Sequence, residues 1–186
     1  MPLTKLDPMP ALVLIDMQKG IVGLPLVHAR DVVVANNARL AQAFRARGLP
    51  VVLVNVTGAA PGRTESGHAF VFPPDWTDLV PELQTHPDDH RVSKARWGAF
   101  HGTSLDDHLR ARGVTQVILA GVATSMGVES TARAAYDHGY HVVLVTDAMS
   151  DVDAAAHRHS IEHVFPRLGE TARTADVLAQ VAPERV

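Results

Sequence analysis

The first residue that could do chemistry is Asp16, which directly follows the apolar run ALVLI. Ligands of open parallel sheets bind beyond the carboxyl ends of the strands, so a polar residue at such an end is a candidate. The neighbours Ile15 and Met17 would partly desolvate the carboxyl group, which raises its pKa toward a value useful for acid–base catalysis. The alternative is an aspartate that caps the following loop, and position alone does not separate the two interpretations.

Two further segments could stabilise charge. Lys94 lies in HRVSKARWGAF, where strand alternation turns it to the same side as Val92. Its ammonium group could hold the aspartate ionised or bind a substrate carboxylate. In GVATSMGVEST (121–131) a strand is expected to turn into a helix, whose first backbone amides stabilise anions. The alternatives are a solvated surface lysine and an ordinary helix cap by Thr124 or Ser125.

Short apolar runs indicate the strands that must position these residues. Four runs are apolar continuously rather than alternately, which is typical of parallel strands covered on both faces. Helical patterns lie between them, and we expect the helix after the fourth run to end at Pro166 and Gly169. The order predicts a three-layer α/β/α sandwich. The expected strands are 11–17, 50–56, 115–122, 140–148 and an edge strand at 171–173, and the expected helices are 28–47, 103–112, 125–138, 152–165 and 175–181.

Residues 57–93 break this rhythm with many glycines and prolines. A segment of this length without regular structure is usually a lid or a binding loop. Its aromatic residues, and those that follow Lys94, could line a small pocket or belong instead to the core or a subunit interface: Phe70, Phe72, Trp76, Trp97 and Phe100.

The composition excludes several classes of protein. The 186 residues include no cysteine, so disulfides, thiolate metal sites and a cysteine nucleophile are excluded. The 17 basic and 20 acidic side chains give a formal charge of −3, and the absence of a basic stripe argues against a nucleic-acid partner. No apolar run approaches the ~18 residues of a membrane span, and the first residues do not form a signal peptide. We expect one soluble, cytoplasmic domain over residues 1–186.

Four motifs in order resemble the isochorismatase-like hydrolase superfamily: LVLIDMQKG, VSKARWGAFHGTSLDDHLRARGV, ILAGVATSMGVESTARAAYDHGY and VVLVTDAMSD. The resemblance runs from about residue 10 to 181. It implies a six-stranded, mainly parallel sheet with helices on both faces, and a homo-oligomer that acts on a small-molecule substrate. Most members are cysteine hydrolases of amides, with an aspartate after strand one, a lysine in a KxR segment and a cysteine at the strand-to-helix turn.

Carried over to this sequence, the family aspartate is Asp16, the lysine is Lys94, and the cysteine position falls on Gly127. The non-proline cis peptide bond typical of the family would lie between Val122 and Ala123. Because glycine has no side chain that could attack a carbonyl, the acyl-enzyme route is closed at this position.

Isochorismatases themselves also have glycine at this position, and they hydrolyse a vinyl ether to release pyruvate. The resemblance therefore implies that Asp16 protonates the enol-ether carbon and that water adds to the oxocarbenium ion, with Lys94 nearby. The string AFHG (99–102) is similar to theirs. The sequence departs from theirs at residues 123–125, where they read YAH, and at Val56, where they have glutamine.

Two other interpretations stay open. One is a family member that binds a small acid or acts in an assembly without catalysis. The other is an amidase-type hydrolase with a different nucleophile. Ser125 is a poor candidate for that nucleophile, because its hydroxyl should point away from the cysteine position and no histidine has a clear claim to be its base.

No metal or cofactor is expected. The zinc-binding branch of the family uses an Asp-x-His motif after strand two, where residues 55–58 read NVTG. His157, His159 and His163 are interpreted as a solvated helix face, although the last two have the i,i+4 spacing of metal ligands.

The predicted site therefore has a catalytic and a binding part. An arginine could also contact an anionic substrate, with Arg63, Arg91 and Arg96 as the candidates. The predicted catalytic residues are Asp16, Lys94 and Gly127, and those expected to bind the substrate or an oxyanion are Trp97, Phe100, Val122, Ala123, Thr124, Ser125 and Met126.

Overall fold

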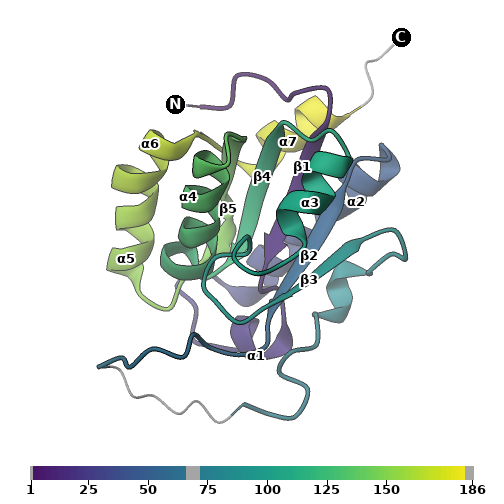
Figure 1. The fold of residues 1–186 in the computed structure, drawn as a ribbon. Helices are drawn as coiled ribbons and strands as arrows, with labels where there is room; N and C mark the ends of the chain where they lie inside the picture. Colours follow the sequence, from purple (N-terminus) through teal and green to yellow (C-terminus); the bar gives the residue numbers. More distant parts are fainter. Residues whose placement is uncertain (1, 66–71, 183–186) are drawn as a thin grey trace.

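A six-stranded sheet lies at the centre of the protein (Figure 1). The computed structural model describes residues 2–65 and 72–182. The strands are β1 (Pro10–Ile15), β2 (Val51–Val56), β3 (His90–Lys94), β4 (Gln116–Val122), β5 (His141–Ser150) and β6 (Glu170–Ala172). They lie in the order β3-β2-β1-β4-β5-β6, and each neighbouring pair is parallel. The predicted parallel sheet is confirmed, including the edge strand near residue 171.

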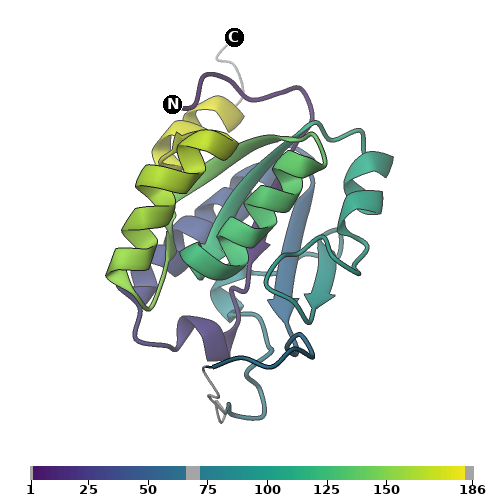
Figure 2. The ribbon, with the colours of Figure 1, turned by 60° about the vertical axis from the view of Figure 1, so that its left-hand side comes forward.

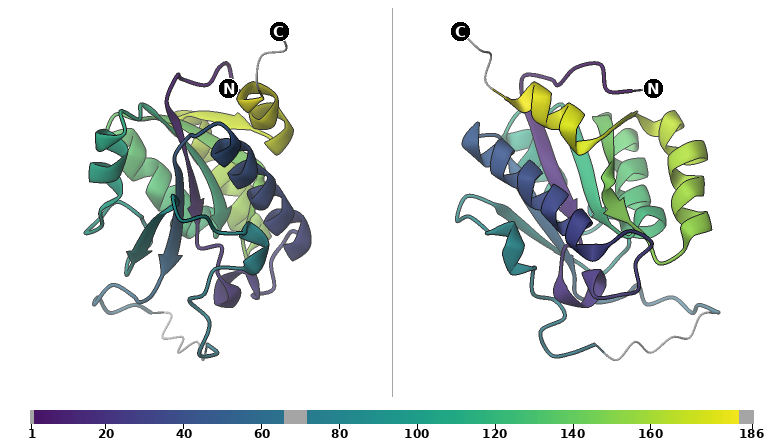
Figure 3. Two further views of the ribbon diagram at one scale, coloured as in Figure 1. Left: turned by 90° about the vertical axis from the view of Figure 1, so that its right-hand side faces the viewer. Right: turned by 180° about the vertical axis from the view of Figure 1, so that it is seen from behind.

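Helices cover both faces of this sheet (Figures 1 and 2). The α-helices are α1 (Lys19–Val22), α2 (Arg30–Ala46), α3 (Leu105–Ala111), α4 (Glu129–Asp137), α5 (Ala154–His159), α6 (Phe165–Leu168) and α7 (Thr174–Val181). A 3₁₀ turn η1 (Pro81–Leu83) and two π-helical turns, η2 (Thr124–Val128) and η3 (Ser160–Val164), complete them. Helices α2 and α7 lie on the face seen from behind, and α3 to α6 lie on the other (Figure 3). The predicted three-layer sandwich is confirmed.

The side chains of β1 alternate between two cores. Leu12 and Leu14 pack on the side of α2, together with Phe44. Val13 and Ile15 pack on the side of α3 and α4. All five side chains are fully buried. Since burial of one such side chain contributes about 1.5–3 kcal/mol, alternation in this central strand fixes the two helical layers against the sheet.

Strand β4 comes unusually close to the carboxyl end of β1 at Gly121. The φ angle of Gly121 is +112°, which L side chains rarely adopt, and a Cβ atom there would collide with the carbonyl oxygen of Ile15. The pairing of β4 with β5 also shifts register between Leu119 and Gly121. Glycine is therefore required for β4 to end directly beside β1.

One predicted helix end is wrong. The helix after β5 continues past Pro166 to Leu168 instead of stopping at the proline. The preceding residues form the π turn η3, in which the backbone N–H of Phe165 donates to the carbonyl of Ser160. Pro166 then occupies the first turn of α6, where its missing N–H is not needed. The helical segment ends at Gly169, as predicted.

The long connection from β2 to β3 is held to helix α1. The ammonium group of Lys19 lies 2.6 Å from Oδ2 of Asp75 and 3.3 Å from Oδ2 of Asp78. The backbone N–H of Gly20 donates to the carbonyl oxygen of Trp76 at 3.0 Å. The described part of this connection therefore packs at the carboxyl end of the sheet, where a binding loop was expected. Within the described residues, no helix has the length and apolar character needed to cross a membrane.

A buried ion pair fixes the entry to β3. Arg45 of α2 donates to Asp89 through two bonds, Nε to Oδ1 at 2.9 Å and Nη2 to Oδ2 at 2.8 Å. The same guanidinium donates to the carbonyl of Leu83, and the N–H of His86 donates to Asp89. The Asp89 side chain is almost wholly buried. This network ties α2 and η1 to Asp89, the residue directly before β3.

We predict that Asp89→Asn lowers the free energy of unfolding by about 3 kcal/mol, because it leaves a half-buried guanidinium without its carboxylate. Urea denaturation followed by circular dichroism measures the loss. Asp31→Asn is the matched control, since Asp31 pairs with Arg30 at the exposed surface, and it should leave stability almost unchanged. Equal effects of the two substitutions would contradict the structural importance of the buried pair.

Candidate active site

Asp16 and Lys94 meet beyond the carboxyl ends of β1 and β3. The Nζ atom of Lys94 lies 2.7 Å from Oδ2 of Asp16, and it also donates to the carbonyl of Arg96 at 3.2 Å. Both side chains are buried, with exposed fractions of 7% for Asp16 and 1% for Lys94. Val92 and Lys94 are buried on one side of β3 while Arg91 is exposed, as the alternation predicted.

The backbone of Asp16 explains how its carboxylate reaches this lysine. Its φ angle is +50°, in the left-handed region, where aspartate is tolerated better than most residues. Continued alternation would turn the side chain toward the core of Leu14, away from that of Ile15 and Val92. The left-handed residue ends the alternation, and its N–H stays bonded to the carbonyl of Val54 on β2 at 2.9 Å.

The environment of Asp16 raises its pKa from 3.8 to about 6. Burial is the largest cause, because it disfavours the carboxylate, and the charge and hydrogen bond of Lys94 act in the opposite direction. Oxygen Oδ1 is buried and has no hydrogen-bond partner among the described residues, whereas Oδ2 accepts from Lys94. The group can therefore exchange a proton near neutral pH, and one of its oxygens is unused.

Gly127, at the predicted cysteine position, lies directly against Asp16. A Cβ atom on this glycine would lie 2.8 Å from Cγ2 of Ile15 and 3.2 Å from Oδ2 of Asp16. The first distance is too short for two carbon atoms, and the methyl group belongs to a β-branched side chain with little freedom to move. The volume that a cysteine side chain would need is therefore filled by Ile15 and Asp16.

The turn that carries Gly127 is the predicted anion site, and two of its backbone amides have partners within the protein. The peptide bond between Val122 and Ala123 is cis, as the family resemblance implied. The N–H of Ser125 donates to Oδ2 of Asp151 at 2.7 Å, and the N–H of Met126 donates to the carbonyl of Ala123 at 3.2 Å. These two amides have partners within the protein, and the part of this turn in binding an oxyanion stays a prediction.

The two hydroxyl groups of this turn also point away from Asp16. Ser125 Oγ donates to Oδ2 of Asp151 at 2.8 Å, which agrees with its expected exclusion as nucleophile. Thr124 is fully buried, with Oγ1 within 2.8 Å of Nδ1 of His157 and 3.1 Å of the carbonyl of Ser150. Neither side chain caps the helix, so the capping alternative is wrong. The contact of Thr124 with substrate stays a prediction.

The predicted aromatic lining divides into separate groups. Phe100 is only 8% exposed and stacks on His138, so it belongs to the core, and its contact with substrate stays a prediction. Trp97 is 64% exposed, and its carbonyl oxygen lies 3.7 Å from the Cβ position of Gly127. Met126 is also exposed, by 41%, at the same turn. Phe72 stacks on Trp76 beside α1, and Phe70 lies outside the described residues.

Two residues that position the site were not predicted. The amide of Gln18 is fully buried; it accepts from the N–H of Val56 and donates to the carbonyls of Val56 and Trp76. Asp151 holds Ser125 and accepts from the N–H of Val152. Gln18 lies shortly after β1, and Asp151 directly follows β5. The search for polar residues at the ends of buried strands, which selected Asp16, could therefore have found them as well.

The remaining candidates take no part in the ion pair of Asp16 and Lys94 through their side chains, although the main-chain carbonyl of Arg96 accepts from Lys94. Arg91 projects from the opposite side of β3, and Arg96 bonds through Nη1 to the neighbouring carbonyl of Ala95. His159 and His163 are exposed, with ring centroids 5.1 Å apart. His157 is buried and contacts Thr124, so its assignment to the solvated helix face is wrong. No group of three or more possible metal ligands occurs in the part of the chain that the structure describes.

Comparison with known proteins places this site in a family. Residues 10–176 match the model of the isochorismatase domain. The isochorismatase family protein YwoC of Bacillus subtilis is 40% identical over 179 residues, which are 92% of this chain and 93% of that protein. An isochorismatase family protein from Burkholderia thailandensis superimposes with a TM-score of 0.91 at 44% identity, covering 95% of this chain and 97% of that one.

A third relative is named for its reaction. The ureidoacrylate amidohydrolase RutB of Variovorax paradoxus is 29% identical over 206 residues, covering 93% of this chain and 81% of that enzyme. The family match, the shared fold and the presence of both Asp16 and Lys94 at the ends of their strands agree with one another. The chain belongs to the isochorismatase family of hydrolases.

Proposed function

We propose that the protein hydrolyses a small, anionic vinyl ether, with Asp16 as the general acid. The observation that carries this proposal is the buried carboxyl group itself, which has a pKa of about 6, one unpartnered oxygen and no nucleophilic side chain at Gly127 beside it. Acid–base chemistry needs only a positioned proton, whereas acyl transfer needs an attacking atom.

The two oxygens of Asp16 suggest where the proton resides. Oδ2 accepts a hydrogen bond from Lys94, so the proton of the neutral acid belongs on Oδ1. Transfer to the terminal vinyl carbon forms a C–H bond and leaves an oxocarbenium ion. Water adds to this ion and returns a proton to Asp16, and the hemiketal then breaks its C–O bond to give a ketone and an alcohol. The overall reaction consumes one water molecule.

Lys94 supports the charged state that follows proton transfer. When Asp16 loses its proton, the ammonium group 2.7 Å away stabilises the new carboxylate in a site that water scarcely reaches. The same contact fixes the orientation of the carboxyl group. We therefore assign Lys94 as the electrostatic partner of Asp16.

We predict that Asp16→Asn lowers kcat/KM by about 10³-fold, because the amide has no proton of suitable acidity to transfer. Isochorismate and simpler enolpyruvyl ethers are the probes, and released pyruvate is measured with lactate dehydrogenase. Ser125→Ala is the matched control and should keep most of the activity, since its hydroxyl is bonded to Asp151.

Full activity of Asp16→Asn on any hydrolysed substrate would refute this mechanism. Turnover of amides or carbamoyl compounds that Ser125→Ala abolishes would favour an amidase with a different nucleophile. Tight binding of a small acid without turnover in the whole panel would instead favour a non-catalytic family member.

The pKa of Asp16 gives a second prediction. A general acid must be protonated, so kcat/KM should be highest below pH 6 and fall as the pH rises through the pKa of about 6. Carbon-13 NMR of the Asp16 carboxyl group should show titration at the same pH. Because Lys94 lowers this pKa, Lys94→Met should move the titration to higher pH. A carboxyl group that titrates near pH 4 in both proteins would contradict the assignment.

We also predict that Gly127→Ala lowers kcat/KM by at least about tenfold, because the new methyl group would press on Ile15 and displace the carboxyl group of Asp16. Gly62→Ala is the control, since in the described part of the chain nothing but its own neighbours in sequence lies within 4 Å of its Cβ position. Thermal unfolding checks that both variants fold. Gly127→Cys should lose activity for the same reason and gain no amidase activity; gain of such activity would contradict the closed geometry.

A further inference from the structure

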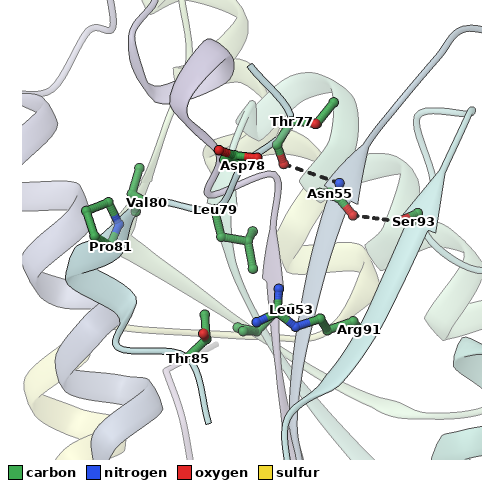
Figure 4. A pocket seen from close by; sticks show the side chains of 10 residues that line it. All are labelled: Leu53, Asn55, Thr77, Asp78, Leu79, Val80, Pro81, Thr85, Arg91 and Ser93. Atoms are coloured by element: carbon green, nitrogen blue, oxygen red, sulfur yellow. Dashed lines mark hydrogen bonds between the residues drawn. The ribbon is translucent and has the colours of Figure 1, made fainter. Parts of the chain in front are cut away.

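The two sides of the Asp16 site are fixed in different ways. On the side of β3, strand pairing places Asn55 of β2 opposite Ser93. Ser93 Oγ donates to Oδ1 of Asn55 at 2.8 Å, and Nδ2 of Asn55 donates to the carbonyl of Thr77 at 3.3 Å (Figure 4). On the other side, the turn η2 brings Gly127 against Asp16, and this turn lies outside the sheet. Its placement therefore depends on contacts other than strand pairing.

The first residue of η2, Thr124, is held at two points. Its side chain is fully buried, and Oγ1 lies 3.1 Å from the carbonyl oxygen of Ser150 at the end of β5. The same oxygen lies 2.8 Å from Nδ1 of His157 on α5. His157 is itself only 7% exposed. Because a buried polar group that loses its partner is unfavourable, this contact ties η2 firmly to both β5 and α5.

The direction of these hydrogen bonds follows from the atoms involved. A carbonyl oxygen can only accept, so the hydroxyl group of Thr124 donates its single hydrogen to Ser150. It must then accept from His157, whose Nδ1 therefore carries a hydrogen. Burial and the neighbouring His28 lower the pKa of His157, although Asp151 acts in the opposite direction. The ring is thus neutral near pH 7, with its hydrogen on Nδ1 and not on Nε2.

A second imidazole keeps the ring of His157 in place. The rings of His28 and His157 meet edge to face, with centroids 4.7 Å apart. Nδ1 of His28 lies 3.1 Å from the carbonyl oxygen of Met149, and its backbone N–H donates to Oγ of Ser150 at 3.0 Å. His28 is therefore bonded to β5, and the ring of His157 packs between this fixed neighbour and Thr124.

Other bonds of the turn hold its later residues. Asp151 accepts from the backbone N–H and the hydroxyl group of Ser125, and Thr131 Oγ1 donates to the carbonyl of Gly127 at 2.6 Å. These bonds should keep the turn folded when the contact at Thr124 is lost. The start of the turn would nevertheless be free to shift, and with it the close packing of Gly127 on Asp16.

We propose that His157 is a positioning residue of the active site: by donating from Nδ1 to Thr124, it holds the turn η2, and Gly127 with it, against Asp16. It acts through Thr124 and does not contact the reacting atoms. Its effect on turnover rests on the proposed acid catalysis by Asp16. Its hydrogen bond and its effect on the surroundings of Asp16 do not.

Nitrogen-15 NMR of the histidine rings tests the hydrogen bond directly. At pH 7.5 we expect His157 to carry its hydrogen on Nδ1, both in the unmodified protein and in Asp16→Asn. A neutral ring with the hydrogen on Nε2 could not donate to Thr124 and would overturn the proposal.

Two substitutions remove the contact from its two ends: His157→Leu and Thr124→Val, the second of which keeps the size of the side chain. Each should lower kcat/KM at least about fivefold, because the carboxyl group of Asp16 loses its fixed orientation. Each should also move the carbon-13 titration of Asp16 from about pH 6 toward 3.8 by at least about 0.5, since a looser turn admits water. The double variant should be no worse than the more affected single variant.

His157→Asn is the conservative variant, because its amide nitrogen can replace Nδ1 as the donor to Thr124. It should keep the titration of Asp16 near that of the unmodified protein and recover most of the activity that His157→Leu loses. His159→Leu is the matched control, since His159 is an exposed histidine on the same helix, and it should change neither measurement. Thermal unfolding checks that all of these variants fold.

The proposal is overturned if Asp16 titrates at an unchanged pH in folded His157→Leu and Thr124→Val. It is also overturned if His157→Asn loses as much as His157→Leu, or if the losses in the double variant add. Absence of turnover on every vinyl ether would refute the proposed function alone, because the ring hydrogen of His157 and the titration of Asp16 still decide what His157 does.

Discussion

The ion pair between Asp16 and Lys94 reaches across a strand, from the end of β1 to the end of β3, with β2 between them. Both backbones are bonded to that middle strand: the N–H of Asp16 donates to Val54, and the carbonyl of Lys94 accepts from Thr57. The sheet therefore sets the distance between the two charges. Their burial is unfavourable and their attraction only partly offsets it, which leaves a carboxyl group that is easily protonated.

The end of β1 is enclosed by backbone as well as by charge. Gly121 brings β4 against the carbonyl of Ile15, and Gly127 brings the following turn against its side chain. Because neither glycine has a side chain, the end of β4 and the turn that follows it can both approach Ile15, the residue before Asp16. This close backbone packing beside Asp16 accompanies the burial that raises its pKa.

The sequence alone predicts the strands and the position of Asp16 and Lys94, because continuous apolar runs and strand alternation are local properties. The left-handed backbone of Asp16 and the path of the chain through Pro166 depend on tertiary contacts, so local patterns miss them. Phe100 belongs to the core for the same reason: its spacing from Lys94 does not reveal which neighbours it meets. The engaged backbone amide of Ser125 depends on Asp151, which follows the end of a different strand, β5.

Gln18 connects the end of β1 to the loop before β3 through hydrogen bonds that do not depend on the side chains of the loop. Its amide group binds only main-chain atoms, those of Val56 and the carbonyl of Trp76. Every amino acid supplies such a carbonyl, so the loop can exchange its side chains while its anchor to the sheet persists. Substitutions in this loop can therefore change its side chains while the loop keeps its anchor and the carboxyl group of Asp16 keeps its position at the end of β1.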